Sequence, residues 1–388
     1  MVAKPVRILA DENMPFAREA FATLGEVRAM GGRKIAPADV AAVDGLMVRS
    51  ITKVNAGLLE KSPVSFVGTA TIGVDHVDTA WLAGRKIAFA SAPGCNANSV
   101  SEYILAILLE MAARKGFTLK GKRLGIVGVG NVGSRVAVKA RAAGMEVILN
   151  DPPLAEKTGD KKYRPLDEIF AADFVTMHVP LEKAGPYPTH HMADASFFKR
   201  LGPGKGFINA SRGGVHDTAA LKAVIAKKEL LFCALDVWEK EPEIDLDLLA
   251  MMDIATPHIA GYSFEGKVNG TGMIYDAACA HFGMPPVWQR ASVLGTPRAV
   301  SPAFTGRYED DLRTAIRGNY DIFEDDRALR AAGRPGAIGP GFDRLRKEYR
   351  MRREFTNTAL KVGRSTDPGL ARTLKDLLFA VQTEGGPL

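Results

Sequence analysis

The sequence predicts an α/β protein with two doubly wound parallel-sheet domains and a C-terminal α+β domain. Short apolar runs alternate with amphipathic stretches, which is typical of parallel strands joined by crossover helices. This alternation occurs twice, and a long apolar helix pattern over residues 98–116 separates the two series. The chain has 388 residues, more than one ordinary core holds, so two or three domains are expected.

Each strand of the two series is expected where an apolar run is bounded by turn residues. The first series has strands at 6–10, 45–49, 65–70 and 87–92, with helices such as 15–25 and 55–61. The second has strands at 124–129, 146–151, 174–179, 206–211, 231–237 and 253–257. After residue 285 the chain is rich in Pro, Gly and Ser, and then more charged. We expect one domain of 1–97 with 260–286, a second of 98–259 and a third of 287–388.

The composition and charge of the chain argue against a nucleic-acid-binding, membrane or metal-binding protein. The net charge is +7, but acidic and basic residues are interspersed, and no nucleic-acid-binding signature accompanies the basic run 344–353. That run is expected to be a dimer contact or a solvated helix. No apolar run is long enough to span a membrane, and no secretory signal pattern or metal-ligand spacing appears. The three cysteines (Cys95, Cys233, Cys279) are odd in number and far apart, which favours reduced thiols in the cytoplasm.

A glycine-rich loop lies between a predicted strand and a predicted helix. Its glycines are Gly128, Gly130 and Gly133, in the spacing G-x-G-x-x-G. The first glycine permits a tight turn, the second a close backbone approach to a pyrophosphate, and the third close packing of helix on strand. The helix start offers free N–H groups to the phosphates. Asp151 ends the next strand, where a carboxylate accepts hydrogen bonds from ribose hydroxyls and repels a 2′-phosphate. We therefore predict NAD, not NADP.

Three further strand ends carry Arg212, Glu241 and His258. The carboxyl ends of parallel strands face the ligand crevice, so these side chains could converge there. Oxidation of an alcohol needs a base for the proton, which histidine can be, while a carboxylate beside it orients the ring. An arginine can bind a substrate carboxylate through two hydrogen bonds. Each residue alone would be an ion-pair, helix-start or loop residue. Together, downstream of a dinucleotide loop, they predict a catalytic set.

The order of GVGNVG, SRGG, DVWEKEP and PHIAG resembles the D-isomer-specific 2-hydroxyacid dehydrogenases over roughly residues 1–285. The resemblance implies Arg212, Glu241 and His258 as catalytic residues and places Asp236 near the nicotinamide amide. Relatives often have a threonine after His178, where this chain has Val179, so only a backbone contact to NAD is expected there. The cofactor residues we expect are Gly128, Gly130, Asn131, Val132, Gly133, Asp151, Val179, Ala210, Asp236 and Gly261.

The motifs ADENMP, MVRSITKVN, FVGTATIGVDHVD, APGCNA and PHIAGYSFEGK are similar to those of family members that act on a phosphorylated four-carbon acid. The resemblance implies oxidation of 4-phospho-D-erythronate, a step toward pyridoxal phosphate, with Ser50, Thr71 and Tyr262 contacting the substrate. Arg49 and the backbone at Gly73 follow strand ends and offer further donors. The alternatives for Ser50 and Thr71 are turn capping, and for Tyr262 packing. The resemblance also implies a homodimer formed through the C-terminal domain.

Two other functions stay open at this point. The first is a related dehydrogenase that acts on another phosphorylated acid, such as 3-phosphoglycerate. The second is an NAD-sensing interaction protein without catalysis, against which the Arg212, Glu241 and His258 set argues.

Overall fold

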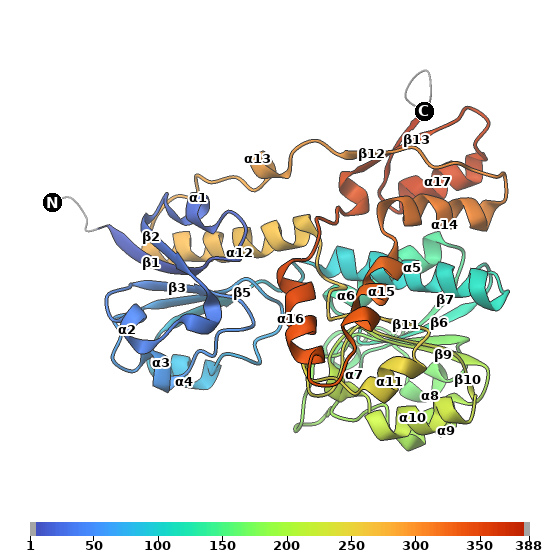
Figure 1. Ribbon diagram of the computed structural model, residues 1–388, viewed down its shortest axis with the longest axis horizontal. Helices are drawn as coiled ribbons and strands as arrows, with labels where there is room; N and C mark the ends of the chain where they lie inside the picture. The colour runs from blue at the N-terminus through green and yellow to red at the C-terminus, as the bar shows by residue number, and fades with distance from the viewer. Residues whose placement is uncertain (1–4, 384–388) are drawn as a thin grey trace. The chain divides into compact units, whose positions relative to one another are not determined.

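The computed structural model describes residues 5–383, which form two compact units (Figure 1). Unit 1 comprises Met1–Asn96 and Ser263–Thr296, and unit 2 comprises Ala97–Tyr262 and Pro297–Leu388. The C-terminal segment, expected as a third domain, thus packs with the glycine-loop domain. Within residues 5–383, no helix combines the length and apolarity that crossing a membrane requires.

Unit 1 is a five-stranded parallel sheet in the order β2-β1-β3-β4-β5. Its strands are β1 (Val6–Asp11), β2 (Gly25–Met30), β3 (Gly45–Val48), β4 (Phe66–Thr69) and β5 (Ala88–Ser91). Its helices are α1 (Ala17–Phe21), α2 (Pro37–Val40), α3 (Ala56–Leu59), α4 (Thr79–Gly84), α12 (Phe264–Phe282) and α13 (Ala291–Leu294), with a 3-10 turn at Gly32–Lys34. The residues of β3 and β4 are all buried, as expected for central strands covered on both faces. Helix α12 packs on β4 and β5, so a late segment of the chain completes this core.

The main sheet of unit 2 has six parallel strands in the order β11-β10-β9-β8-β6-β7. These are β6 (Arg123–Val127), β7 (Glu146–Asn150), β8 (Phe174–Met177), β9 (Lys205–Asn209), β10 (Leu230–Leu235) and β11 (Ile254–Ala255). The helices are α5 (Ala97–Lys115), α6 (Asn131–Ala142), α7 (Pro152–Thr158), α8 (Leu166–Ile169), α9 (Ala195–Leu201), α10 (Thr218–Ala226) and α11 (Leu246–Met251), with a 3-10 turn at Gly213–Val215. The predicted parallel α/β architecture is confirmed for both units.

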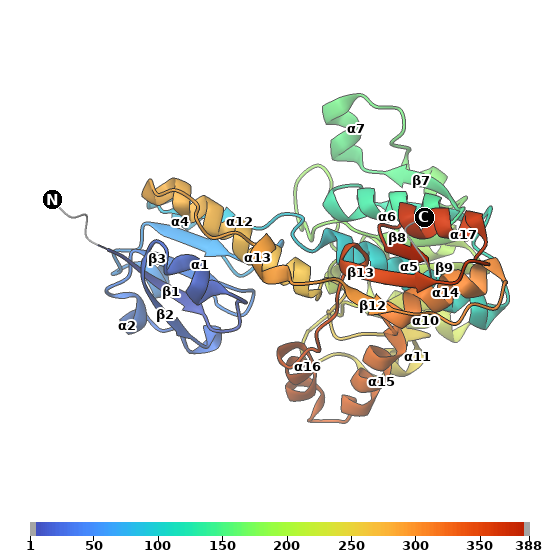
Figure 2. The same ribbon diagram turned by 90° about the horizontal axis from the view of Figure 1, so that it is seen from above.

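The C-terminal part of unit 2 contains helices and a second, three-stranded parallel sheet in the order β12-β13-β14. Its elements are β12 (Arg298–Val300), α14 (Tyr308–Asn319), α15 (Ile322–Ala332), α16 (Ile338–Lys347), a 3-10 turn (Phe355–Asn357), β13 (Thr358–Val362), α17 (Pro368–Asp376) and β14 (Ala380–Thr383). Helices α14 and α15 contact α5. Helix α17 lies beside α6 and contacts it (Figure 2).

Helix α5 is buried around its whole circumference, from Ala97 to Ala112. It contacts β10 of the main sheet as well as α14 and α15, so both sides of the helix are covered. A mostly apolar helix that is buried on all sides needs such an environment. The C-terminal part of the chain therefore shares one hydrophobic core with the main sheet of unit 2.

Candidate active site

The glycine loop joins β6 to α6 and has the geometry that the spacing predicts. Gly128 has a φ of 86°, in the left-handed region that glycine tolerates best. A Cβ atom on Gly133 would lie 2.0 Å from the carbonyl oxygen of Gly128, so helix and loop pack too closely for any side chain. A Cβ atom on Gly130 would have no protein atom within 4 Å, which leaves the backbone there open to a ligand.

The surroundings of the loop fit a dinucleotide. Gly130 precedes α6 without any side-chain cap, so the first N–H groups of the helix remain available to a pyrophosphate, and Asn131 and Val132 form that first turn. Asp151 accepts from the backbone N of Val129 at 2.7 Å and from Leu154 N at 3.0 Å. Its carboxylate is thus fixed beside the glycine loop, and each oxygen keeps a lone pair for a ribose hydroxyl.

The segment after β8 forms another wall of this loop. A Cβ atom on Gly128 would lie 2.7 Å from the backbone of His178 and 2.9 Å from Val179 N. Val179 is therefore next to the glycine loop, where its predicted backbone contact to NAD would be made. Burial lowers the pKa of His178 to about 3, so this ring is neutral, and its Nε2 lies 2.9 Å from the Thr176 hydroxyl.

The three predicted catalytic residues follow neighbouring strands of the main sheet. Arg212 comes after β9, Glu241 after β10 and His258 after β11, and the strands lie in the order β11-β10-β9. All three therefore belong to one carboxyl edge of the sheet, the edge on which the glycine loop also lies.

His258 and Glu241 form a directly bonded pair. The distance between His258 Nδ1 and Glu241 Oε2 is 2.7 Å, and the other carboxylate oxygen accepts from Trp238 N at 2.9 Å. Burial raises the pKa of Glu241, but the charge and hydrogen bond of His258, with the Trp238 N–H and the charge of Arg346, outweigh it, so the pKa lies below its ordinary value. The side chain of His258 is 31% exposed, so the pair orients the ring through Nδ1 and leaves Nε2 as the group that can exchange a proton with a substrate.

The loop that carries His258 is held by Asp236. This buried carboxylate accepts from the Thr256 hydroxyl at 2.6 Å and from the backbone N of Ile259 and Ala260 at 2.8 and 2.9 Å. His258 itself has a φ of 57°, a left-handed conformation that costs a non-glycine residue on the order of 1 kcal/mol. Asp236 thus stabilises a strained loop, and its predicted contact to the nicotinamide amide stays a prediction.

Arg212 is half-buried, directly before the turn Gly213–Val215. Its guanidinium donates to the Ser211 carbonyl at 2.8 Å, and Asn209 donates to the Arg212 carbonyl at 3.0 Å. A Cβ atom on Gly213 would lie 1.9 Å from the carbonyl oxygen of Trp238. The loop of Arg212 therefore packs directly on the backbone that fixes Glu241. Two predicted cofactor residues flank this region, Ala210 after β9 and Gly261 after His258, and both are half-buried.

Four predicted substrate residues, Arg49, Ser50, Thr71 and Gly73, lie in unit 1, whereas Tyr262 belongs to unit 2. Ser50 is exposed and Arg49 half-buried after β3. The Thr71 hydroxyl donates to the Gly73 carbonyl at 2.9 Å and lies 2.9 Å from the Thr69 hydroxyl. Thr71 therefore makes the contacts expected of a turn-capping residue, and its contact with substrate stays a prediction.

Two basic residues near the predicted substrate contacts were missed in the sequence. Burial, and then the charge of Arg49, lower the pKa of Lys267 to about 8. Arg346 donates from Nε to the Tyr262 hydroxyl at 3.2 Å. Lys267 belongs to the quoted PHIAGYSFEGK motif, which could have drawn notice to it. Arg346 lies 84 residues beyond Tyr262, and no local pattern connects the two.

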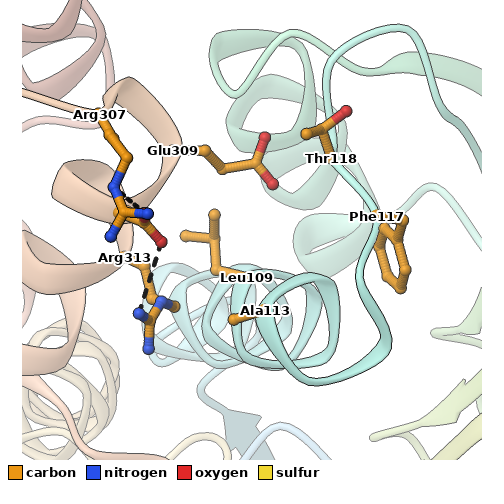
Figure 3. Close-up of a pocket in the computed structure, with 8 residues that line it drawn as sticks. Leu109, Ala113, Phe117, Thr118, Arg307, Glu309 and Arg313 are labelled. Carbon is orange, nitrogen blue, oxygen red and sulfur yellow. Dashed lines mark ion pairs between the residues drawn. The ribbon is translucent and has the colours of Figure 1, made fainter.

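A separate pocket of about 170 Å³ lies where the end of α5 meets the start of α14 (Figure 3). Arg307 and Arg313 both pair with Asp310, at 2.9 and 3.6 Å. Glu309 accepts from Leu119 N at 3.0 Å. The pocket contains none of the predicted site residues, and its charges are paired with one another or with the backbone. It therefore belongs to the packing of the C-terminal part on α5.

A dinucleotide loop and a histidine–carboxylate pair on one sheet edge define a dehydrogenase of alcohols. Residues 96–260 match the family described as D-isomer specific 2-hydroxyacid dehydrogenase, NAD binding domain. The chain belongs to this family, and its cofactor is NAD. Residues 298–377 match a family described as a domain of unknown function (DUF3410).

Curated relatives carry one particular name. The chain is 45% identical over 372 residues to the erythronate-4-phosphate dehydrogenases of Yersinia pestis and Yersinia pseudotuberculosis, which covers 95% of this chain and 98% of theirs. Solved structures are similar in fold to a shorter part of this chain. NAD-bound 3-phosphoglycerate dehydrogenase of Entamoeba histolytica has a TM-score of 0.61 at 24% identity, over 72% of this chain and 96% of that one. D-lactate dehydrogenase of Aquifex aeolicus with NAD and lactic acid has a TM-score of 0.59 at 25% identity, over 71% and 95%.

Proposed function

We propose that this NAD-dependent 2-hydroxyacid dehydrogenase oxidises 4-phospho-D-erythronate to (R)-3-hydroxy-2-oxo-4-phosphooxybutanoate, a step in pyridoxal 5′-phosphate biosynthesis. The observation that carries the reaction is the 2.7 Å contact between His258 Nδ1 and Glu241 Oε2 at the sheet edge next to the glycine loop. The choice of substrate is supported by the 45% identity, which extends over 95% of the chain and includes its C-terminal part.

In this proposal each side chain of the edge has one role. His258 Nε2 accepts the proton of the C2 hydroxyl, and Glu241 stabilises the imidazolium that results. The guanidinium of Arg212 holds the substrate carboxylate and polarises the oxygen on C2. Ser50, Thr71 and Tyr262 contact the rest of the substrate, with donors from Arg49 and the backbone at Gly73. Bound NAD supplies the hydride acceptor for C2.

Cofactor contacts are assigned in the same proposal. The N–H groups at Asn131 and Val132 bind the pyrophosphate, and Asp151 binds the adenosine ribose. The backbone at Val179, Ala210 and Gly261, with Asp236, lines the nicotinamide side.

The test is formation of NADH by purified protein supplied with NAD and 4-phospho-D-erythronate, with 3-phosphoglycerate in parallel. A 2-oxo acid is added in a further sample, so that NADH retained by the enzyme passes its hydride to this acid and the resulting 2-hydroxy acid is detected as product. We expect turnover on the erythronate. Turnover only on 3-phosphoglycerate would keep the reaction type and change the assigned substrate. Turnover on neither acid, with NAD bound, would favour a non-catalytic NAD-sensing protein.

Replacement of the base checks the role assignment. His258→Ala should leave NAD affinity nearly unchanged and lower kcat by about 10²–10⁴-fold, the usual contribution of a general base. His281→Ala is the matched control, because His281 bonds Ser65 in unit 1 and has no role in this mechanism. Near-normal turnover of His258→Ala would contradict the proposed base.

We also propose that two copies pair through the C-terminal part and that the enzyme works in the cytoplasm. Met351 and Leu378 are apolar residues of that part that expose 67% and 52% of their surface, so they serve as probes of the pairing. Three buried free cysteines support a reducing compartment. Light scattering of the wild-type protein and of a Met351→Lys, Leu378→Lys double variant tests the pairing, and a wild-type monomer would contradict it.

A further inference from the structure

The basic run 344–353 separates into residues with different surroundings. Arg350 pairs with Asp325 and with Glu324. Arg352 is buried and donates to the carbonyls of Ala260 and Ser99 at 3.1 and 2.7 Å. These two arginines therefore have packing roles. Arg346, at the end of α16, has a different setting.

Helix α16 is firmly seated within unit 2, beside α15 (Figure 1). Ile338 and Phe342 are buried in the same cluster as Trp238, the residue whose backbone binds Glu241. A Cβ atom on Gly339 would lie 1.8 Å from Glu243 Oε1, so the helix start packs closely on the segment that follows Glu241. The position of Arg346 is thereby fixed relative to the histidine–carboxylate pair.

The guanidinium of Arg346 faces Tyr262. Its Nε atom donates to the Tyr262 hydroxyl at 3.2 Å, and its central carbon lies 5.7 Å from the centre of that ring. Tyr349 packs edge-to-face with Tyr262, with ring centres 5.6 Å apart. Tyr262, four positions after His258, is thus in contact with two residues of the C-terminal part.

Arg346 differs from Arg330 and Arg350 in having no direct ion pair. Arg330 pairs with Asp326 at 2.9 Å and Arg350 with Asp325 and Glu324. In the portion of the chain that the structure describes, no ion pair within 4 Å joins Arg346 to a carboxylate. Burial lowers the pKa of Arg346, but the more distant charges of Glu241 and Asp343, with the Tyr262 contact, outweigh it and keep the guanidinium charged. Its side-chain hydrogen bond uses Nε. The two terminal nitrogens are therefore available as a fork for a tetrahedral oxyanion.

We propose that Arg346 binds the phosphate of the substrate together with the Tyr262 hydroxyl, so that the C-terminal part supplies a specificity-determining residue of the active site. This inference rests on the proposed function, because it assumes a phosphorylated 2-hydroxy acid. The competing account is that Arg346 only positions Tyr262, and the two accounts differ in what they predict for a substrate without phosphate.

The experiment compares Arg346→Met and Arg346→Lys with wild-type enzyme on 4-phospho-D-erythronate and on D-erythronate. Arg344→Met is the matched control, since Arg344 lies exposed on the same helix and its loss removes the same charge. For Arg346→Met we expect kcat/KM on the phosphorylated acid to fall about 10–100-fold, the range of one charged hydrogen-bonding group, mainly through KM. Arg346 also acts through its charge on Glu241, which affects both acids, so the value on D-erythronate should fall too, but by clearly less than the value on the phosphorylated acid. Arg346→Lys should fall in between because it keeps the charge without the fork.

An equal loss on both acids would overturn the proposal in favour of positioning, and so would an unchanged kcat/KM on the phosphorylated acid. A second measurement does not depend on turnover, namely the affinity of NAD-loaded protein for inorganic phosphate by calorimetry. Wild-type and Arg344→Met proteins should bind phosphate about 10-fold more tightly than Arg346→Met. If wild-type enzyme oxidises neither acid, the proposed function fails, and the phosphate affinities alone then decide for or against the anion site.

Discussion

Replacing Glu241 by glutamine tests the histidine–carboxylate pair most sharply, because the structure fixes how the amide must lie. Glu241 Oε1 accepts from Trp238 N at 2.9 Å, and a glutamine must keep its carbonyl oxygen there. Its NH₂ group then takes the place of Oε2, 2.7 Å from His258 Nδ1. An amide in that position donates, so Nδ1 becomes the acceptor and the neutral ring carries its proton on Nε2. The tautomer that serves as base is thereby disfavoured.

The expected loss has two parts. A hydrogen bond to a charged group contributes about 1.5–3 kcal/mol, and Glu241 makes this contact with the imidazolium that forms during oxidation. That alone corresponds to about 10–150-fold in rate, since each 1.4 kcal/mol is tenfold. The wrong tautomer adds to it, so we expect kcat to fall by about 10²–10⁴-fold. The affinity for NAD should stay within about threefold, because the glycine loop does not involve Glu241.

The assay is the initial rate of NADH formation, with NAD affinity measured by quenching of protein fluorescence. Glu239→Gln is a control of matched chemistry, since Glu239 forms the same kind of pair with His191, at 2.8 Å, outside the proposed site. We expect it to retain most of the activity. A Glu241→Gln enzyme within about fivefold of wild type, or an equal loss in Glu239→Gln, would refute the reasoning.

Further changes have equally definite outcomes. Gly133→Ala places a Cβ atom 2.0 Å from the Gly128 carbonyl oxygen, so it should lower both the melting temperature and the affinity for NAD. The Cβ atom of Gly130→Ala meets no protein atom within 4 Å, so this variant should weaken NAD binding only. Thermal melts and NAD titration measure the two effects. Burial raises the pKa of Glu102 to about 8, so the folded chain keeps a proton that the unfolded chain loses at lower pH. The stability of the wild-type protein therefore falls as the pH rises toward 8. In thermal melts from pH 6 to 9, the melting temperature of Glu102→Gln should rise relative to that of wild type. Arg212→Lys should lower kcat/KM about 10–100-fold on any 2-hydroxy acid, phosphorylated or not, and a loss confined to phosphorylated acids would contradict its assignment to the carboxylate.

Much of the fold could be predicted because parallel strands buried on both faces have strong local signals. The runs at 45–49 and 65–70 correspond to β3 and β4, whose residues are all buried. Strand β2 was missed: it pairs only with β1, at the edge of the sheet, and its residues Glu26 and Arg28 are exposed. An edge strand with one neighbour and little burial has no strong apolar pattern of its own. Whether such a segment forms a strand depends on its pairing with the neighbouring strand.

The candidate site divides in the same way. The glycine spacing and the strand ends bearing Arg212, Glu241 and His258 are local features, and the structure places all three of these residues on one sheet edge. The contact of Arg346 with Tyr262 joins residues 84 positions apart through the packing of α16. No periodicity or spacing rule encodes such a contact, because it depends on how a helix of the C-terminal part docks on the main sheet.

The core of unit 1 has a consequence for how the protein is made. Helix α12 covers β4 and β5, and Ile274 and Tyr275 are buried against Phe21 and Met47 of the first series. A ribosome finishes β5 and then synthesises residues 97–262 before this cover emerges. At typical elongation rates the apolar sheet face waits roughly 10–30 s, long enough for a chaperone to bind it or for two nascent chains to stick together. The codons of residues 97–262 set how long this face stays uncovered, so changing them is expected to change the yield of native protein.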